Sequence, residues 1–313
     1  MSDLVRVPGA PVPSFGFDPA TNLVPVFLMR FDRENTRRSY TRDLTTFFGS
    51  DMVSLEMARA VTFVHVNAYL AALESDGKSV ATLRRHLACL RGFFAWLVAL
   101  GFLQLNPADR HLVRRIAPDR ARDRVLTVLT RDQAKTLLLG VDLGRETGPR
   151  DYTLVLTLLH CLLRRSEAAA MNIEHLRPVG DYWVLDLPHT KGGVNQTVKV
   201  PGHVAKAITD LAAADQVATG PLWRSYSTNG TRGRRLSASS IYMIVSRLAV
   251  SSGIAGTVGA HTLRHTGCTL AIEGGASVQQ VQTHARHKNV ETTMIYVHQR
   301  DRLANSAADF IDL

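Results

Sequence analysis

The clearest hydrophobic pattern of the chain lies in residues 80–100. Its apolar positions recur at steps of three and four residues, namely Val80, Leu83, Leu87, Leu90, Phe94 and Leu97. Side chains at this spacing share one face of an α-helix. Ser79 stands where an N-cap belongs and Gly101 follows the last turn, so the sequence predicts a helix between these two residues.

The remainder of residues 22–117 is also predicted to be helical, and a second helical stretch opens at Arg37 and ends near Phe48. By contrast, residues 1–20 contain four prolines and two glycines, which is typical of an unpacked segment. We therefore predict a flexible arm over residues 1–20 and a helical domain over residues 21–117.

Several arginines of the helical domain are candidates for contacts with nucleic-acid phosphates, although a solvated helix surface explains any single one of them better. These candidates are Arg37, Arg38, Arg42, Arg84, Arg85 and Arg91. Residues 107–127 are rich in charge and show little periodicity, and we place an interdomain linker at residues 118–128. Arg122, in this linker, is a further candidate for contact with a DNA backbone.

A second domain is predicted over residues 129–313. Thr130 and Gln133 have the spacing of a capping box, which marks the start of a helix. Further helices are expected near residues 151–163, 166–171, 203–213, 238–250, 261–273, 277–285 and 290–298. Residues 182–187 and 197–200 read as two strands joined by a turn over residues 189–195. The chain is therefore predicted to be mainly α-helical, with one small antiparallel sheet in its second domain.

The charge balance suggests a partner. Lys and Arg total 37 against 27 Asp and Glu, which gives a net charge of +10. A basic excess of this size favours a polyanion such as nucleic acid, although a merely basic soluble protein fits it as well.

Other classes of protein are disfavoured by what the sequence lacks. The three cysteines are far apart, so we predict neither a disulfide framework nor a zinc ribbon and expect a reducing, cytoplasmic location. The longest apolar run, residues 93–103, is shorter than the ~20 residues that span a bilayer. The first residues lack the pattern of a signal peptide, and we expect no association with a membrane.

Two arginines of the second domain are suited to hold a phosphate. Arg164 follows an apolar helix, and Arg264 stands at the start of another. A planar guanidinium donates two parallel hydrogen bonds to phosphate oxygens, and two of them would stabilise the charge of a pentacoordinate transition state. Glu167, three residues after Arg164, could share its helix face and hold it in place. Taken alone, each arginine fits an ordinary ion pair as well.

Histidines, a lysine and a tyrosine could supply the proton transfers and the nucleophile. His261 can face the same pocket as Arg264, and His287 follows later in the chain. Lys191 stands beside two glycines in the predicted turn, and Tyr296 is the candidate nucleophile. Nearby cations would lower the pKa of both the ammonium and the phenol.

The histidines also permit a metal site, which we judge less plausible. His261 with His265, or His284 with His287, have the spacing of two ligands on one helix face. No HExxH motif is present and no acidic cluster stands beside either pair, so we predict no metal.

The order and spacing of these residues resemble the tyrosine recombinases of the phage integrase family. The resemblance includes Arg164 with Glu167, then Lys191, then His261 with Arg264, then His287, and Tyr296 nine residues later. It extends to the first domain, where residues 36–43 and 82–101 look like the helical core-binding, SAM-like domain of that family. The family fold would be this domain followed by an α+β catalytic domain.

The resemblance also implies roles for these residues. Arg164 and Arg264 would be the catalytic arginines, with Glu167 as a supporting residue. Lys191 would be the general acid, His261 and His287 the pocket histidines, and Tyr296 the nucleophile of a 3′-phosphotyrosyl link. Neither a cofactor, a metal nor ATP would be needed. The partner would be double-stranded DNA carrying specific sites, bound by a homotetramer that is a monomer or weak dimer when free.

The sequence departs from the usual family pattern at three places. Cys161 and Leu162 replace Thr-Gly, and Arg286 replaces the glycine of Leu-Gly-His. Lys199 stands between two valines where an arginine often occurs. None of these changes removes a predicted catalytic group, but they alter the local backbone packing.

Several alternatives stay open at the level of sequence. A transposase of the same family and a type IB topoisomerase share the chemistry, and a DNA-binding regulator with an inactive site would share the fold. The apolar residues of the C-terminal tail, residues 304–313, could pack on their own protomer or on a neighbour. Neither the DNA target nor the choice among integration, transposition, dimer resolution and inversion follows from the sequence.

Overall fold

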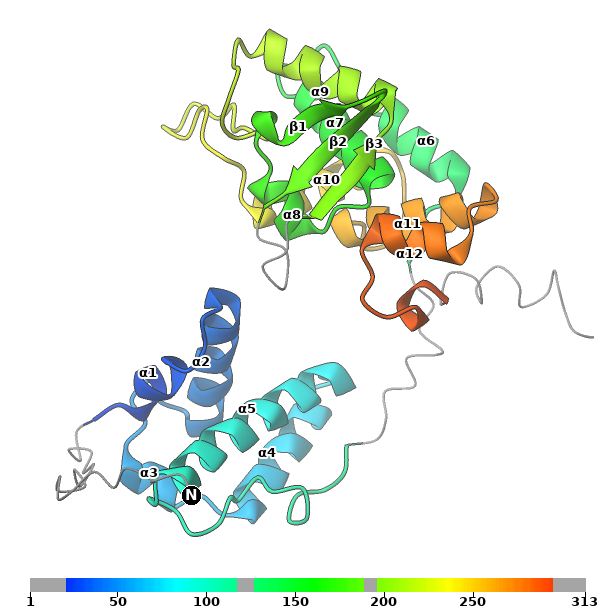
Figure 1. Ribbon diagram of the computed structural model, residues 1–313. Coiled ribbons are helices and arrows are strands. Elements are labelled where there is room, and N and C mark those ends of the chain that lie inside the picture. Colours follow the sequence, from blue (N-terminus) through cyan, green and yellow to red (C-terminus); the bar gives the residue numbers. More distant parts are fainter. Residues whose placement is uncertain (1–20, 117–126, 189–195, 295–313) are drawn as a thin grey trace, which may run out of the picture. The chain divides into compact units, whose positions relative to one another are not determined.

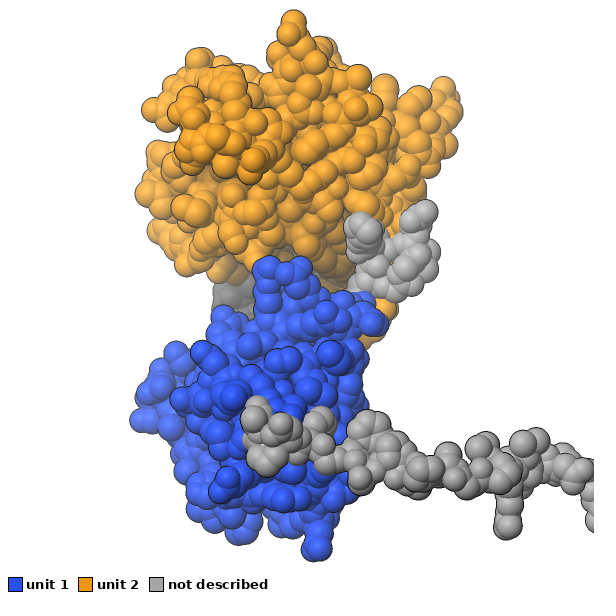
Figure 2. All heavy atoms as spheres, turned by 90° about the vertical axis from the view of Figure 1, so that its left-hand side faces the viewer, with its two compact units in different colours: residues 1–121 blue, residues 122–313 orange. Residues whose placement is uncertain are grey.

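The structure is a computed structural model that describes residues 21–116, 127–188 and 196–294. The chain divides into two compact units, residues 1–121 and 122–313, which Figure 2 shows in different colours. Lys191, Tyr296, Arg122 and the predicted arm and tail lie outside the described residues.

Unit 1 is helical over residues 23–99, whereas residues 100–116, which the sequence also predicted to be helical, form turns without a helix (Figure 1). Its helices are α1 (Leu23–Leu28), α2 (Glu34–Phe48), α3 (Leu55–Arg59), α4 (Phe63–Ser75) and α5 (Val80–Ala99). The predicted helix over residues 80–100 is confirmed as α5. The Ser79 side chain accepts a hydrogen bond from the backbone N–H of Thr82, and Gly101 takes a left-handed conformation with a φ of 77°. Ser79 therefore caps the helix start, and Gly101 ends it as the pattern indicated.

Aromatic side chains fill the centre of unit 1. The ring of Phe27 in α1 lies edge-on to that of Phe93 in α5, with centroids 5.4 Å apart. Phe93 and Phe94 of α5 are fully buried, as is Leu44 of α2. These contacts hold α1 and α2 against α5.

Unit 2 combines helices with one sheet. Its helices are α6 (Arg131–Leu139), α7 (Gly148–Cys161), α8 (Arg165–Ala170), the 3₁₀ helix η2 (Ile173–His175), α9 (Gly202–Ala214), α10 (Ala238–Ser251), α11 (Ala260–Glu273) and α12 (Val278–Ala285). The predicted capping box is confirmed. Thr130 and Gln133 each accept the other's backbone N–H at the start of α6.

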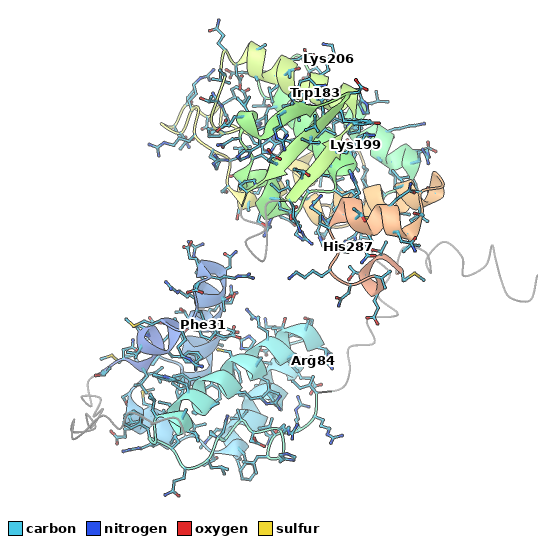
Figure 3. All side chains as sticks on the ribbon, in the orientation of Figure 1. Phe31, Arg84, Trp183, Lys199, Lys206 and His287 are labelled. Carbon is cyan, nitrogen blue, oxygen red and sulfur yellow. The ribbon has the colours of Figure 1, made fainter. Side chains whose placement is uncertain are left out.

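The sheet has three antiparallel strands in the order β1-β2-β3, where the sequence predicted two. The strands are β1 (Leu176–Val179), β2 (Tyr182–Leu187) and β3 (Gln196–Val200). The missed strand, β1, is a short edge strand that contains Pro178 and is largely exposed, so it lacks the alternating apolar pattern of a strand. Trp183 of β2 pairs with Val200 of β3, and Figure 3 shows Trp183 and Lys199 on these neighbouring strands.

Helix α7 forms the centre of unit 2. Nearly all its side chains are buried, and it contacts α9, α11 and β3. A helix that is buried on most of its sides belongs inside a core, and the buried charges of α7, Arg150 and Asp151, are paired with each other. Its last turn therefore has a fixed position in the middle of the unit.

Helix α11 approaches α7 closely at Gly267. A Cβ atom at this position would lie 2.2 Å from the carbonyl oxygen of Leu159 and 2.4 Å from Cδ2 of Leu162. A larger residue would push the two helices apart, so Gly267 allows the middle of α11 to lie beside the end of α7. None of the helices in the described part of the chain is long and apolar enough to cross a membrane.

Candidate active site

Two helix C-termini form the base of the site. Helix α7 ends at Cys161 and is followed by Leu162 in the left-handed conformation, with a φ of 49°. Helix α12 ends at Ala285 and is followed by Arg286, also left-handed, with a φ of 57°. The last carbonyl groups of a helix have no intrahelical N–H partner and carry the negative end of the helix dipole. Such a pair of ends attracts cations.

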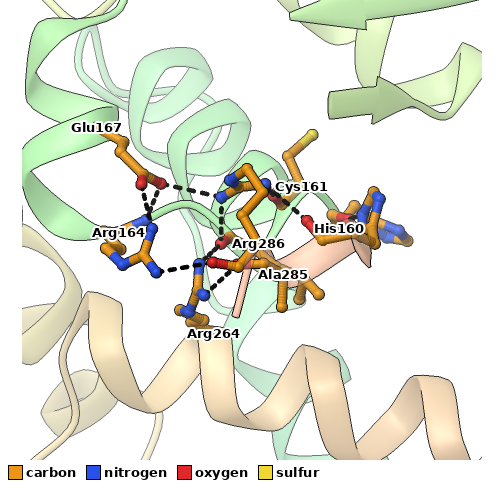
Figure 4. Close-up of polar contacts among 9 residues, drawn as sticks. His160, Cys161, Arg164, Glu167, Arg264, Ala285 and Arg286 are labelled. Carbon is orange, nitrogen blue, oxygen red and sulfur yellow. Dashed lines mark hydrogen bonds and ion pairs between the residues drawn. The ribbon is translucent and has the colours of Figure 1, made fainter. Parts of the chain in front are cut away.

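Three guanidinium groups satisfy these carbonyl oxygens (Figure 4). Arg264 donates from Nη1 to the carbonyl of Leu162 and from Nη2 to that of Ala285. Arg164 donates from Nη2 to the carbonyl of Arg286 over 3.2 Å. Arg286 donates from its own Nη2 to the carbonyl of Leu162 over 2.9 Å. The structure thus brings together Arg164 and Arg264, which are 100 residues apart in the chain.

Glu167 is the carboxylate of this cluster. Arg164 is the N-cap of α8, and Glu167 occupies the third helical position, where its Oε2 accepts the backbone N–H of Arg164 over 2.8 Å. Its Oε1 accepts from Nη1 of Arg164 over 2.6 Å, and Oε2 also accepts from Nη2 of Arg286 over 2.9 Å. Burial alone would raise the pKa of Glu167, but Arg286 and the contacts with Arg164 outweigh it and lower that pKa. The carboxylate is therefore ionised at neutral pH.

The cluster keeps a positive charge, because three guanidinium groups surround one carboxylate. Arg264 is 2% exposed, whereas the side chain of Arg164 is 43% exposed. Burial, with the like charges of Arg164 and Arg286, lowers the pKa of Arg264 to about 10, so this side chain is still cationic at neutral pH. Such a pocket favours an anion.

Two of the predicted histidines lie close to these cations. His261 is one helical turn before Arg264 on α11. His287 follows α12, as Figure 3 shows, and its Nδ1 lies 2.8 Å from Oγ1 of Thr293. Burial and then Arg264 and Arg164 lower the pKa of His261, and they lower that of His287 to about 4. Both imidazoles are neutral at neutral pH and can accept a proton.

The histidine pairs that could bind a metal do not converge on one site. His265 packs its ring against His261 with centroids 4.2 Å apart, and burial lowers its pKa to about 4. His284 makes a polar contact with the carbonyl of His160, through Nε2 over 2.8 Å. Among the described residues, no group of three or more His, Cys, Asp or Glu side chains could hold a metal ion.

The arginines of unit 1 fall into two kinds. Arg91 donates from Nε to the carbonyl of Ala108 over 2.9 Å, and Arg85 lies 3.0 Å from the buried carboxylate of Asp43. These two side chains tie parts of unit 1 together. The arginines at the other predicted positions are exposed, namely Arg37, Arg38, Arg42 and Arg84.

The sequence did not predict the part that three residues play in the site. Thr293 was not singled out, although it is fully buried and contacts His287. Gly267 was not singled out either, although a glycine within a helical pattern is a signal of close packing. Arg286 was noted only as a departure from a glycine, and the structure places its side chain at the centre of the cluster.

Two sequence models of protein families match the chain. That of the phage integrase family matches residues 127–302. The chain belongs to the phage integrase family. The family's N-terminal SAM-like domain matches residues 27–101, so both units carry the family's characteristic domains.

Curated relatives and solved structures agree with this membership. The tyrosine recombinase XerC of Thermodesulfovibrio yellowstonii is 28% identical over 277 residues, which cover 87% of this chain and 88% of the relative. The XerC of Mycobacterium tuberculosis is 29% identical over 269 residues, covering 84% and 88% respectively.

Among solved structures, the XerH recombinase bound to a palindromic difH substrate has a TM-score of 0.67 at 18% identity, covering 88% of this chain and 79% of its own. A lambda integrase dimer bound to a core site also has a TM-score of 0.67, at 17% identity, covering 91% and 77%. These likenesses show the shared fold of the phage integrase family.

Proposed function

We propose that this protein is a site-specific DNA recombinase that cuts and rejoins DNA through a covalent bond between Tyr296 and a 3′ phosphate. The observation that carries the proposal is the convergence of Arg164, Arg264, His261 and His287 around the ends of α7 and α12. Two guanidinium groups and two neutral imidazoles are the groups that a metal-free phosphoryl transfer requires.

In the cleavage step, the phenol oxygen of Tyr296 attacks the phosphorus of the scissile phosphodiester, and His261 accepts the phenol proton. Arg164 and Arg264 donate to the non-bridging oxygens and stabilise the charge that develops on them. The bond between phosphorus and the 5′ oxygen breaks, and Lys191 donates a proton to that oxygen. The 3′ phosphate is then linked to the enzyme.

In the rejoining step, the 5′ hydroxyl of a partner strand attacks the phosphotyrosine and releases the phenol. One phosphodiester is exchanged for another, so the bond energy is conserved in the covalent link and ATP hydrolysis is not needed. His287 shares the proton transfers of the pocket, and Glu167 keeps Arg164 in place.

We further propose that the partner is double-stranded DNA carrying a specific site, and that the acting form is a homotetramer. The net charge of +10 supports a polyanionic partner. A lambda integrase tetramer bound to a Holliday junction is among the solved structures that share this fold. Unit 1 would hold the DNA, with Arg38, Arg42 and Arg84 as exposed candidates for phosphate contacts.

The proposal is tested by trapping the covalent link. The full chain is incubated with nicked duplexes tiled from the DNA that flanks its gene, and the products are separated on a denaturing gel. We expect a protein–DNA adduct with the original chain and none with Tyr296→Phe, while both bind DNA equally in a gel-shift assay. An adduct that persists in the variant would show that the nucleophile is another residue.

A further inference from the structure

Arg286 has an unusual backbone for its residue type. Its φ is 57°, in the left-handed region that favours glycine, and an arginine there costs free energy that glycine would not. Despite this cost, its side chain is 4% exposed, whereas the arginines of a helix end normally extend into solvent. The contacts of the guanidinium must offset both the backbone cost and the burial.

Those contacts join the ends of two helices. Nη1 of Arg286 donates to the carbonyl of His284 over 2.7 Å, in its own helix α12, and to that of Cys161 over 3.4 Å, at the end of α7. Nη2 donates to the carbonyl of Leu162 over 2.9 Å. One side chain therefore caps α7 and α12 together, and it does so beside the carbonyl groups that also receive Arg264.

Arg286 also binds Glu167 from the inner side. Oε1 of Glu167 accepts a hydrogen bond from the guanidinium of Arg164. Oε2 accepts one from the backbone N–H of Arg164 and another from Nη2 of Arg286. Because Arg286 is buried and Arg164 is 43% exposed, the carboxylate lies between an inner cation and an outer one (Figure 4). Burial raises the pKa of Glu167, but the charge of Arg286 together with the hydrogen bonds and the charge of Arg164 gives a net lowering.

We propose that Arg286 is a positioning residue for DNA cleavage, which acts through Glu167 to hold Arg164 in the orientation that binds the scissile phosphate. Nothing in the chemistry requires Arg286 to touch DNA. Arg286 fixes the carboxylate, and the carboxylate fixes Arg164. This inference rests on the proposed function.

The main test replaces Arg286 by glycine, which suits the left-handed backbone and removes only the side chain. With nicked duplexes tiled from the DNA that flanks the gene, we expect single-turnover formation of the covalent adduct to slow at least about tenfold. The dissociation constant for the same DNA should change less than about twofold, because binding is dominated by many phosphate contacts. Arg286→Lys should recover part of the rate, since it restores a charge without the planar fork.

A double-mutant cycle separates positioning from general support of the fold. If Arg286 acts through Glu167, then Arg286→Gly should slow adduct formation by less than about twofold in a Glu167→Gln background. The same slowing in both backgrounds would show that Arg286 acts independently of Glu167 and would overturn the inference. Adduct formation followed over hours keeps the slow double variant measurable.

Gln216→Gly is the matched control. Gln216 also has a left-handed backbone, with a φ of 54°, and it lies in the turn after α9. This change should leave the rate of adduct formation unaltered. If Arg286→Gly unfolds the chain, the comparison uses Arg286→Lys, which should be folded and slower than the original chain. A folded Arg286 variant with the original rate would overturn this inference, whereas an original chain that forms no adduct would overturn the proposed function.

Discussion

Each unit of the molecule buries a carboxylate beside arginine, Asp43 in unit 1 and Glu167 in unit 2, and the pKa values of these two carboxylates shift in opposite directions. In unit 1, Asp43 is fully buried, with Arg85 at 3.0 Å and His86 at 3.3 Å from Oδ1. Neither of its oxygens accepts a hydrogen bond from the described residues. Burial raises the pKa of Asp43 against the opposing effect of Arg85.

In unit 2, Glu167 is also buried, but both oxygens accept hydrogen bonds and its pKa is lowered. The difference lies in geometry, because a nearby cation compensates for desolvation only when its N–H groups point at the oxygens. The surroundings of Asp43 therefore disfavour its ionised form, whereas those of Glu167 favour the ionised form. Of these two arrangements, only the second holds its partly exposed cation, Arg164, by hydrogen bonds to the carboxylate.

Replacing each carboxylate by its amide should give the largest contrast. Glu167→Gln leaves buried Arg286 without its anion, and we expect a loss of about 3 kcal/mol in the stability of unit 2. Adduct formation should slow about 100-fold, as when a transition-state donor is misplaced. Asp43→Asn should change the stability of unit 1 by less than about 1 kcal/mol, because the charge it removes is poorly solvated.

The measurement is denaturant unfolding followed by tryptophan fluorescence. Trp96 reports on unit 1, while Trp183 and Trp223 report on unit 2. Trp96→Phe therefore isolates the signal of unit 2, and the double change of Trp183 and Trp223 to Phe isolates that of unit 1. Equal losses for the two amide variants would contradict the comparison.

Two helical glycines give the next largest contrast. Gly267→Ala in α11 places a Cβ 2.2 Å from the carbonyl oxygen of Leu159, and we expect it to destabilise unit 2 by about 2 kcal/mol and to slow adduct formation. Gly92→Ala in α5 places its Cβ 3.6 Å from Phe27, an ordinary contact. This change should stabilise unit 1 by about 0.5 kcal/mol through helix propensity. A stabilised Gly267→Ala variant would show that α7 and α11 do not pack as described.

Acid should weaken unit 2 more than unit 1. His265 and His287, whose pKa values are lowered to about 4, stay neutral in the folded state while the unfolded chain takes up protons below about pH 6.5. Their contribution to stability is lost as the pH falls from about 6.5 to 4. Glu167, with a lowered pKa, adds a loss of the same sign at lower pH.

In unit 1, two groups change the stability in opposite directions as the pH falls. Burial lowers the pKa of His86 to about 4, so its contribution is also lost on acidification. The raised pKa of Asp43 acts in the other direction, because the folded state then binds its proton more readily than the unfolded chain. Melting temperatures of the two reporter variants between pH 7 and pH 4.5 test this, and a larger decrease for unit 1 would refute it.

The last expected effect is confined to unit 1 and concerns Tyr69. Its hydroxyl lies 2.8 Å from Nδ1 of His86, the same histidine whose Nε2 approaches Asp43. Tyr69→Phe should lower the stability of unit 1 by about 1 kcal/mol, the contribution of one hydrogen bond. The rate of adduct formation should stay unchanged, and a slowed rate would mean that this network also serves catalysis.

Local structure was largely predictable from the sequence. Helix α5 and the start of α6 follow from periodicity and caps, because both depend on residues within a few positions of each other. The edge strand β1 was missed, since its hydrogen bonds come from β2 and its own residues are exposed and include a proline. The close approach of α11 to α7 could not be predicted either, because it depends on which residue faces Gly267.

The candidate site shows the same division. The sequence by itself determined the order of chemical groups and the pairing of Arg164 with Glu167, because residues three positions apart lie on the same face of a helix. Only the tertiary structure decided that Arg264 donates to the carbonyl of Leu162 at the end of α7. It also decided that the buried side chain of Arg286 donates to Glu167, which Arg164 contacts as well. Those contacts join groups more than 100 residues apart, and they form because buried carbonyl and carboxylate oxygens must find donors wherever the fold brings them.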